Sequence, residues 1–254
     1  MEYDLTRPST GRMYDFWLGG NHNFEIDRQL ANNLEKQFPR MRGFCVDERA
    51  FTGRCVKYFH QQGIRAILDF GSSLPTCGNT HLVAHDLDPE IKVVYSDIDP
   101  ITVAYGKELL SETPNAIFLH NNAANPLGIL AAPETHALLG DQRRVGILFN
   151  ALPHLIADDQ VCTAWRILFD WAAPGSFMSV SGPTADWLVY PDTAPIIETY
   201  NRSGLVSYLR TREQYVAMLP PWQLTAEGIA DNLAWGLPPQ NSQPIYFYSM
   251  MLRK

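Results

Sequence analysis

Two aspartates, Asp69 and Asp97, each follow a short, mainly apolar segment of the chain. The segment 64–68 leads into Asp69, with Gly71 two residues later, and the segment 93–96 leads into Asp97. If both segments are neighbouring strands of a parallel α/β sheet, their ends lie at the edge where such sheets bind ligands. An acid at the tip of the second strand can accept hydrogen bonds from both ribose hydroxyls of an adenosine, and a glycine after the first strand lets the backbone come close to a ligand. We therefore predict a nucleoside pocket.

The loop after the first segment favours S-adenosylmethionine over NAD as the ligand. A dinucleotide fold needs G-x-G-x-x-G there, because a pyrophosphate must approach bare backbone and a helix N-terminus. Here Gly71 stands alone and Asp69 precedes it, so an NAD-dependent oxidoreductase is disfavoured. The carboxylate of Asp69 would repel a pyrophosphate but attract the ammonium of a methionine. The alternative is that Asp69 and Asp97 merely cap the helices that follow them.

The composition fits one enzyme domain. The 254 residues are 46% hydrophobic, which is enough for a large core, and α/β folds of this length are commonly single domains. Lys and Arg number 20 against 27 for Asp and Glu, which gives a formal charge of −7. The chain has no Lys/Arg cluster of the kind that binds nucleic acid or an anionic membrane surface, which argues against both partners. Because no signal pattern and no apolar run of membrane-spanning length are present, we expect a cytoplasmic protein.

The cysteines and histidines do not form a metal-binding pattern. The four cysteines include no C-x-x-C pair, and we expect reduced, mostly buried thiols. His81 and His85 have the i,i+4 spacing of a helical metal pair, but the glutamate of H-E-x-x-H is missing. We therefore expect two helix-surface histidines and no metal site.

Alternating strand and helix patterns predict a parallel, doubly wound α/β sheet that follows a helical region. The expected strands are 64–70, 92–96, 116–120, 145–150 and 176–181. The expected helices are 27–38, 47–62, 78–85, 100–110, 158–171 and 211–219, with a loop or short helix at 125–136. Two further β-like runs, 222–230 and 245–252, predict an antiparallel hairpin at the sheet edge.

We expect a single domain, 1–254, with three parts. Residues 1–62 would form a helical cap and 63–182 the cofactor-binding core. Residues 183–254 would supply acceptor-side loops, a helix and the terminal hairpin.

Two groups of short motifs allow a comparison with a known family. The N-terminal group is Pro8-Ser9, Arg12, Tyr14-Asp15, Leu18-Gly19-Gly20, Asn23-Phe24 and Asp27-Arg28. The second group is Leu68-Asp69-Phe70-Gly71, Leu74-Pro75-Thr76, Asn79-Thr80-His81 and Tyr95-Ser96-Asp97-Ile98-Asp99-Pro100, and the similarity continues through Ala151-Leu152-Pro153-His154 and Pro174-Gly175-Ser176. Over nearly its whole length the chain resembles an S-adenosyl-L-methionine-dependent methyltransferase family that is common in actinobacteria and was first catalogued as a domain of unknown function.

The resemblance implies a class I methyltransferase fold, which is a Rossmann-like seven-stranded sheet with an antiparallel last strand, here with a helical N-terminal cap. By position, Asp69 and Gly71 would face the methionine part of the cofactor, Asp97 the ribose and Ile98 the adenine. The cap motif, with Tyr14 among its residues, would close over the cofactor. The full expected cofactor-binding set is Tyr14, Gly19, Gly20, Asn23, Phe24, Asp69, Gly71, Ser72, Asn79, Asp97, Ile98 and Asn122.

Three positions depart from the family pattern. The family loop usually continues after Gly71 as Thr-Gly, whereas this chain has Ser72 and Ser73, and a side chain at 73 would crowd the backbone approach unless it hydrogen-bonds the ligand. Asn122 stands where the family has an adenine-reading aspartate, although its amide oxygen can still accept a hydrogen bond. Leu82 stands where the family often has glutamate. These departures keep open a degenerate protein that binds S-adenosylmethionine or S-adenosylhomocysteine without methyl transfer.

Methyl transfer from a sulfonium is an in-line displacement that needs mainly positioning and desolvation. His154, just beyond the fourth expected strand, is the candidate general base, since histidine titrates near neutral pH. The alternative is a helix N-terminal histidine bonded to nearby backbone. Asp186, Trp187 and Tyr190 follow the fifth strand on a loop that would either line the acceptor pocket or be solvated.

The sequence therefore predicts an S-adenosylmethionine-dependent methyltransferase with a small-molecule acceptor and with neither a nucleic-acid nor a membrane partner. It leaves the acceptor and the oligomeric state open, with a homodimer as one option.

Overall fold

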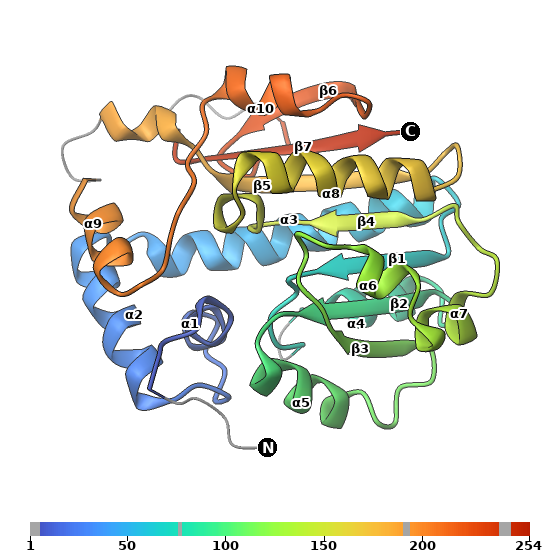
Figure 1. The fold of residues 1–254 in the computed structure, drawn as a ribbon, viewed down its shortest axis with the longest axis horizontal. Helices are drawn as coiled ribbons and strands as arrows, with labels where there is room; N and C mark the ends of the chain where they lie inside the picture. Colours follow the sequence, from blue (N-terminus) through green and yellow to red (C-terminus); the bar gives the residue numbers. More distant parts are fainter. Residues whose placement is uncertain (1–5, 76–77, 190–193, 239–244) are drawn as a thin grey trace.

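A seven-stranded sheet forms the centre of the molecule, in the order β3-β2-β1-β4-β5-β7-β6 (Figure 1). The computed structural model describes residues 6–75, 78–189, 194–238 and 245–254. The strands are β1 (Ala66–Phe70), β2 (Lys92–Asp97), β3 (Ala116–His120), β4 (Gly146–Phe149), β5 (Phe177–Pro183), β6 (Gln223–Asp231) and β7 (Phe247–Arg253). Pairs among β1 to β5 are parallel, and β7 is antiparallel to both β5 and β6. The predicted fold class is confirmed.

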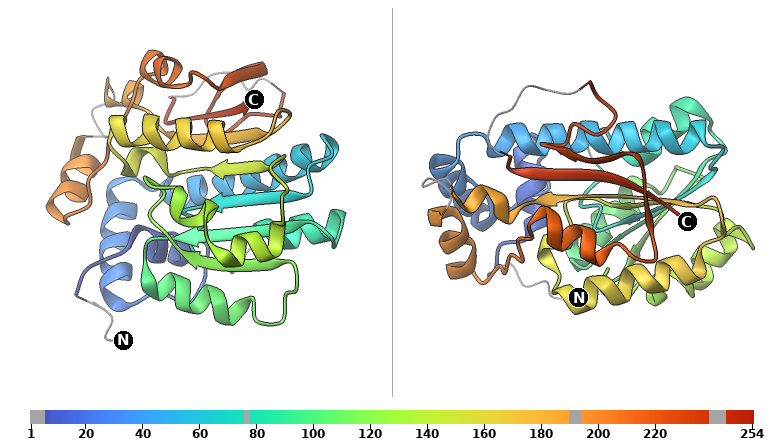
Figure 2. Two further views of the ribbon diagram at one scale, coloured as in Figure 1. Left: turned by 45° about the vertical axis from the view of Figure 1, so that its right-hand side comes forward. Right: turned by 90° about the horizontal axis from the view of Figure 1, so that it is seen from above.

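Helices cover both faces of the sheet and also the end at which β1 and β4 finish. They are α1 (Thr10–Trp17), α2 (Glu25–Gln37), α3 (Met41–Gln61), α4 (Thr80–Leu87), α5 (Pro100–Leu109), α6 (Leu127–Leu130), α7 (Pro133–Leu139), α8 (Asp158–Trp171), α9 (Ala194–Arg202) and α10 (Arg212–Met218), with two 3-10 turns, η1 (Pro153–Leu155) and η2 (Ala185–Val189). Seen from above, α3 lies on one face and α8 and α10 lie on the other (Figure 2). In the described ranges, no helix is both long and apolar enough to cross a lipid bilayer.

The central strands are buried along their whole length. All residues of β1, β4 and β5 are buried, which is the pattern of parallel strands covered on both faces. One apolar cluster, with Phe51 and Phe59, lies on the α3 side, and a second cluster, with Trp165 and Leu168, lies on the α8 side. The sheet is therefore a rigid platform whose strand ends carry the polar residues.

The carboxyl ends of β1 and β4 point toward the region occupied by α1, α2 and α9 (Figure 1). Two of these helices, α1 and α9, were missed by the sequence analysis. α1 is short and begins with Thr10 and Gly11, so its helical signal is weak. Burial of Met13 and Trp17 and an N-cap at Ser9 hold it in place. α3 also begins at Met41, six residues earlier than expected, so its buried face extends farther into the cap.

The predicted terminal hairpin is confirmed, with β7 placed between β5 and β6. A bulge between Leu224 and Ile229 interrupts its pairing, and β6 forms the edge of the sheet. This arrangement leaves the carboxyl ends of β1 to β4 uncovered by strands, and the cap helices take that place.

The approach of α3 to the sheet depends on Gly146. A Cβ built on Gly146 of β4 would lie 2.3 Å from Cδ2 of Phe59, which is fully buried on α3. We expect Gly146→Ala to lower the free energy of unfolding by ~1–3 kcal/mol, as overpacking in a tight core does. The measurement is urea-induced unfolding.

Gly43→Ala is the matched control, because Gly43 lies exposed on α3 and a Cβ there would meet nothing within 4 Å. That variant should be unchanged or more stable by up to ~1 kcal/mol, since alanine favours helix. Equal effects of the two substitutions would contradict the close α3–sheet contact.

Candidate functional site

A cavity lies at the carboxyl ends of the strands, between the sheet and the cap. Its walls come from α1 and α3 on the cap side, from the tips of β1, β2 and β3, and from the tips of β4 and β5. Of the expected cofactor-binding residues, those that line this cavity are Tyr14, Asp69, Gly71, Ser72, Asp97, Ile98 and Asn122. The strand-end carboxylates and the glycine loop are thus brought together as predicted.

Asp97 at the end of β2 is 7% exposed and is held by two backbone donors. Its Oδ1 accepts from the Asp99 N–H at 2.9 Å, and its Oδ2 accepts from the Ser73 N–H at 3.1 Å. Burial raises the pKa of Asp97 to about 6. The N-cap of α5 is Asp99, whose Oδ1 accepts from the Ile101 N–H. The alternative in which Asp97 caps that helix is therefore wrong.

Asp69 at the end of β1 shares its surroundings with a cation. Thr80 Oγ1 donates to Asp69 Oδ2 at 2.6 Å, while the N-cap of α4 is Asn79, so Asp69 is not that cap either. Burial raises the pKa of Asp69 to about 6, against the opposing effects of Thr80 and Arg49. The Arg49 guanidinium lies 5.1 Å from the centre of the Tyr14 ring, and its buried Nε and Nη2 have no hydrogen-bond partner among the described residues.

Arg49 was not among the expected site residues. It lies on α3, far from the strand-end motifs in sequence, and only the packing of α3 over β1 brings it to the cavity. An arginine in a predicted helix gives no signal that would have marked it in advance.

The loop after β1 has the backbone shape that the glycine predicts. Gly71 has φ +60°, and a Cβ there would lie 2.6 Å from Cδ1 of Leu152. Ser73 also adopts a positive φ, 56°, and its Oγ donates to the Gly11 carbonyl of α1 at 2.7 Å. Its side chain therefore ties the loop to the cap rather than extending into the cavity. The motif residue Thr76 lies outside the described residues.

The far wall beyond β2 and β3 carries Ile98 and Asn122. Ile98 is 60% exposed although it is a large apolar residue, which suits a surface that a flat apolar ligand covers. Asn122 Oδ1 accepts from the Ala124 N–H at 2.9 Å, which leaves this oxygen one further lone pair.

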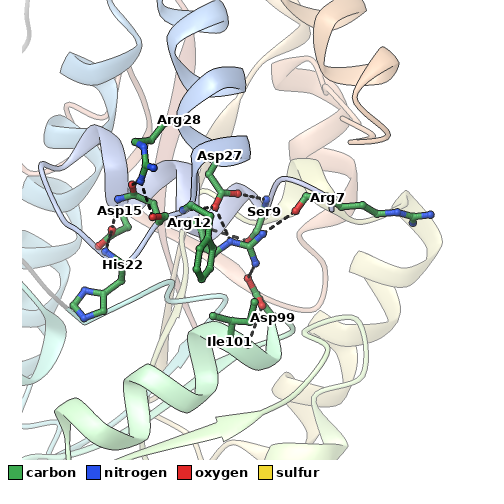
Figure 3. A network of polar contacts seen from close by, with 12 residues as sticks. Arg7, Ser9, Arg12, Asp15, His22, Asp27, Arg28, Asp99 and Ile101 are labelled. Carbon is green, nitrogen blue, oxygen red and sulfur yellow. Dashed lines mark hydrogen bonds and ion pairs between the residues drawn. The ribbon is translucent and has the colours of Figure 1, made fainter. Parts of the chain in front are cut away.

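Several residues of the N-terminal motif build a buried ionic network (Figure 3). Arg12 is 3% exposed; its Nε donates to Asp27 at 2.8 Å and its Nη1 to Asp99 at 2.6 Å. Its Nη2 donates to the Arg7 carbonyl. One guanidinium thus joins α1, the start of α2 and the loop that follows Asp97.

Five of the expected cofactor-binding residues do not line the cavity. They are Gly19, Gly20, Asn23, Phe24 and Asn79. A Cβ at Gly20 would lie 2.1 Å from Oδ1 of Asp15, and Asn23 donates to Asp15 and accepts from Arg28. Phe24 is the N-cap residue of α2. These motif residues shape the turn between α1 and α2, because the short loop needs its own polar partners.

A second polar cluster lies over β4 and β5, and the sequence analysis missed it. Ser181 Oγ of β5 donates to Glu48 Oε1 of α3 at 2.7 Å and accepts from the Ala151 N–H at 2.9 Å. Asn150 donates to Thr52 Oγ1 at 3.0 Å. Burial raises the pKa of Glu48 to about 7. The sequence pattern predicted the helix α3, but it gave no sign that the side chain of Glu48 is turned toward the sheet.

His154 lies on η1 and lines the same side of the cavity, half-buried. Burial, with a smaller contribution from the Arg210 guanidinium, lowers its pKa to about 3, so its imidazole is neutral at pH 7. Its Nδ1 has no hydrogen-bond partner among the described residues. Trp187 also lines the cavity, whereas Asp186 accepts from the Tyr248 hydroxyl instead, and Tyr190 lies outside the described residues.

The expectation of two helix-surface histidines is wrong for His81, which is 8% exposed. Its backbone N–H donates to the Tyr95 hydroxyl at 2.6 Å, and its Nδ1 lies 2.9 Å from the same oxygen. Burial lowers its pKa to about 4. Within the parts of the chain that the structure describes, no three His, Cys, Asp or Glu side chains gather as a metal site would require.

The thiols are free where the structure describes them. Cys45 and Cys55 are buried, but Cys162 is exposed. Cys77 lies outside the described residues.

The sheet order, the antiparallel seventh strand and a cavity at the strand ends define the class I methyltransferase type of fold. A family model described as S-adenosyl methyltransferase matches residues 1–247, and the chain belongs to this family. The family uses S-adenosylmethionine as its cofactor, so the predicted family and cofactor are confirmed.

Two solved structures are similar to nearly the whole chain. A candidate methyltransferase from Thermobifida fusca is 28% identical with a TM-score of 0.90, and the match covers 99% of this chain and 96% of that one. A DUF574 family protein from Streptomyces avermitilis is 25% identical with a TM-score of 0.90, over 99% of both chains. The N-methyltransferase NodS from Bradyrhizobium japonicum shares the fold alone, with 12% identity, a TM-score of 0.51 and coverage of 85% and 98%. No curated protein matches the sequence.

Titration of Glu48 should be visible in the stability of the protein. Its folded pKa of about 7 lies above its ordinary value of 4.5, so the folded state binds the extra proton between these values. The free energy of unfolding therefore falls as pH rises from 4.5 to 7. Glu48→Gln cannot titrate, so it does not lose stability in this pH range. The free energy of unfolding of the variant minus that of wild type should therefore be roughly 3 kcal/mol larger at pH 8 than at pH 4.5. Urea unfolding at both pH values measures this difference.

The control is Asp47→Asn, which changes the exposed neighbouring acid on α3. The charged groups that act on Glu48 are Arg49, Arg54 and Asp47, and the tyrosines Tyr14 and Tyr215 face it from α1 and α10. A Glu48→Gln effect that is the same at both pH values would show that the Glu48 carboxyl titrates normally.

Proposed function

We propose that the protein transfers a methyl group from S-adenosylmethionine to a small-molecule acceptor. The observation that carries this proposal is the set of charged groups in the cavity. The acid Asp97 lies at the tip of β2, and the opposite charges of Asp69 and Arg49 lie beside the tip of β1. The two hydroxyls of a ribose need an acceptor such as Asp97. The ammonium and the carboxylate of a methionine end need opposite charges such as those of Asp69 and Arg49.

The residues present fit this cofactor. Asp97 would accept from the ribose hydroxyls, Ile98 would lie against the adenine, and Asn122 would accept from its amino group. Asp69 would hold the ammonium, with Gly71 and Ser72 supplying the nearby backbone. Arg49 would bind the carboxylate through the two nitrogens that have no partner among the described residues. Tyr14 holds the guanidinium by its ring face and fixes its own hydroxyl on the Cys45 carbonyl.

The cofactor supplies an electrophilic methyl carbon on a sulfonium. The protein's own contribution is to position the acceptor in line with that carbon and to exclude water. His154, just beyond β4, is the proposed acceptor-side group, because it lines the cavity and its imidazole is neutral at pH 7.

A small acceptor is supported by the enclosure of the site. Helices α1 and α3 line one side of the cavity, the strand tips line another, and α9 with Phe247 lines a third, which favours a compact ligand over a polymer. The lining is rich in aromatic and aliphatic side chains, as in other small-molecule sites.

Binding of S-adenosylhomocysteine and of adenosine tests the assignment, because adenosine lacks the amino-acid end. Asp97→Ala should weaken both ligands by ~1–3 kcal/mol, the cost when polar groups lose a buried partner. Arg49→Met should weaken S-adenosylhomocysteine by a similar ~1–3 kcal/mol and leave adenosine unchanged. Isothermal titration calorimetry measures the four affinities.

Asp86→Ala serves as the control, since Asp86 is exposed on α4. Thermal unfolding of each variant checks that the fold is retained. If Asp97→Ala left both affinities at the wild-type value, Asp97 would serve only to hold the Ser73 and Asp99 backbone. If Arg49→Met weakened adenosine as well, its assignment to the carboxylate would be wrong.

A further inference from the structure

One buried carboxylate oxygen in the cavity has no role in holding the cofactor. Glu48 is 4% exposed and lines the cavity, and its Oε2 has no hydrogen-bond partner among the described residues. A buried carboxylate oxygen without a donor is costly. Because Glu48 belongs to the cavity wall, a donor group of a bound ligand is the natural partner for this oxygen.

The position of Glu48 in the cavity is fixed from the other oxygen. Ser181 of β5 donates to Oε1, and Ser181 is itself oriented by the Ala151 N–H at the tip of β4. The sheet order puts β4 and β5 on the opposite side of β1 from β2. Glu48 therefore belongs to the half of the cavity away from Asp97, where an acceptor has room.

Aromatic side chains line this half of the cavity. The rings of Phe38 and Phe44 stack at 5.6 Å, and Trp187 meets Phe38 edge-on at 5.7 Å. Phe247 of β7 lies 4.7 Å from Phe44. All four line the cavity, so a bound molecule meets an aromatic surface beside the polar cluster.

The charges of the lining also select the occupant. Among the described residues of the cavity wall, the acids are Glu48, Asp69 and Asp97, and the permanent cation is Arg49. S-adenosylmethionine has one net positive charge, because its sulfonium and ammonium outweigh its carboxylate. With the cofactor bound, one negative charge remains, and Glu48 is the acid that the cofactor does not use. His154 cannot supply the matching cation, since its imidazole is neutral at pH 7.

We propose that the methyl acceptor is a hydrophobic amine, which enters as an ammonium ion and binds through its nitrogen to Oε2 of Glu48. The assignment rests on the proposed methyltransferase function and names the acceptor class of that same site. An anionic acceptor would meet the like charge of Glu48, and an uncharged acceptor would offer its carboxylate no counter-charge.

Glu48 then also takes the proton that methylation requires. The ammonium gives one proton to Oε2, which frees the nitrogen lone pair. That lone pair forms the new bond to the methyl carbon, while the carbon–sulfur bond breaks and leaves its electron pair on sulfur. The product leaves as a methylated ammonium ion, and Glu48 returns its proton to solvent. Burial raises the pKa of Glu48 to about 7, which suits a group that accepts and releases a proton near neutral pH.

The test compares three phenyl probes of similar size on protein saturated with S-adenosylhomocysteine. They are 2-phenylethylamine, 2-phenylethanol and 3-phenylpropanoate, titrated by calorimetry into wild type, Glu48→Gln and the control Asp47→Asn. In wild type the amine should bind at least about tenfold more tightly than either other probe, as expected for one charge-assisted hydrogen bond. Glu48→Gln should abolish this preference, whereas Asp47→Asn should keep it. The affinity for S-adenosylhomocysteine should stay within about twofold in both variants.

Retention of the amine preference in Glu48→Gln would overturn the proposal, as would equal or tighter binding of 3-phenylpropanoate by wild type. The absence of saturable amine binding to the loaded wild type would also overturn it. If wild type bound no S-adenosylhomocysteine, the proposed function would fail separately. The same three probes on the free protein would then decide the Glu48 assignment, since Glu48 lines the cavity in either case.

Discussion

The buried guanidinium of Arg12 is the interaction on which the site depends. It bonds to Asp27 at the start of α2 and to Asp99 at the start of α5, and both partners are removed from solvent with it. Loss of one partner from such a buried set typically costs about 3–5 kcal/mol, because the remaining charge stays desolvated. Since Asp99 is two residues from Asp97, the network holds the cap in a fixed place over the Asp97 end of the cavity. The Ser73–Gly11 hydrogen bond joins the same two parts a second time.

The cavity between sheet and cap has two chemically different halves, because the order of the strands places different side chains at their ends. On the β1 and β2 side, the acid Asp97 is placed as a diol would need, and Asp69 and Arg49 carry the two charges that a zwitterion would need. On the β4 and β5 side, one carboxylate stands among aromatic rings. Three buried carboxyls with raised pKa values lie in this space, and burial is the main cause for each. Such destabilised acids are typical of sites that bind a cationic ligand, because the ligand returns the lost solvation.

The sequence predicted the parts of the fold that depend on local pattern. Strand bounds, the helix start at Pro100 and the antiparallel end of the sheet follow from short-range signals, and β3 and α8 have the predicted bounds. Asp97 and Gly71 could be identified because a parallel sheet gathers its strand ends at one edge. The positions of Arg49 and Glu48 in the cavity wall could not, since both depend on how α3 is rotated against the sheet.

The motif residues could not be sorted by role from the sequence, for a different physical reason. Gly20 and Asn23 lie in a motif close to Tyr14, which does line the cavity, but they serve the fold of the turn. A glycine that avoids a carboxylate and one that approaches a ligand look the same in sequence. The same ambiguity affects Ser73, whose side chain was expected either to crowd the backbone approach or to hydrogen-bond the ligand and instead bonds the cap.

The most direct test of the account is calorimetric titration of the wild-type protein with S-adenosylmethionine, S-adenosylhomocysteine and NADH. The arrangement of Asp97, Asp69 and Arg49 predicts saturable binding of the first two, with Kd on the order of 1 μM, and no binding of NADH. Binding of NADH without binding of S-adenosylmethionine would contradict the central claim. Failure of all three would show that the cavity between cap and sheet is not a nucleoside site.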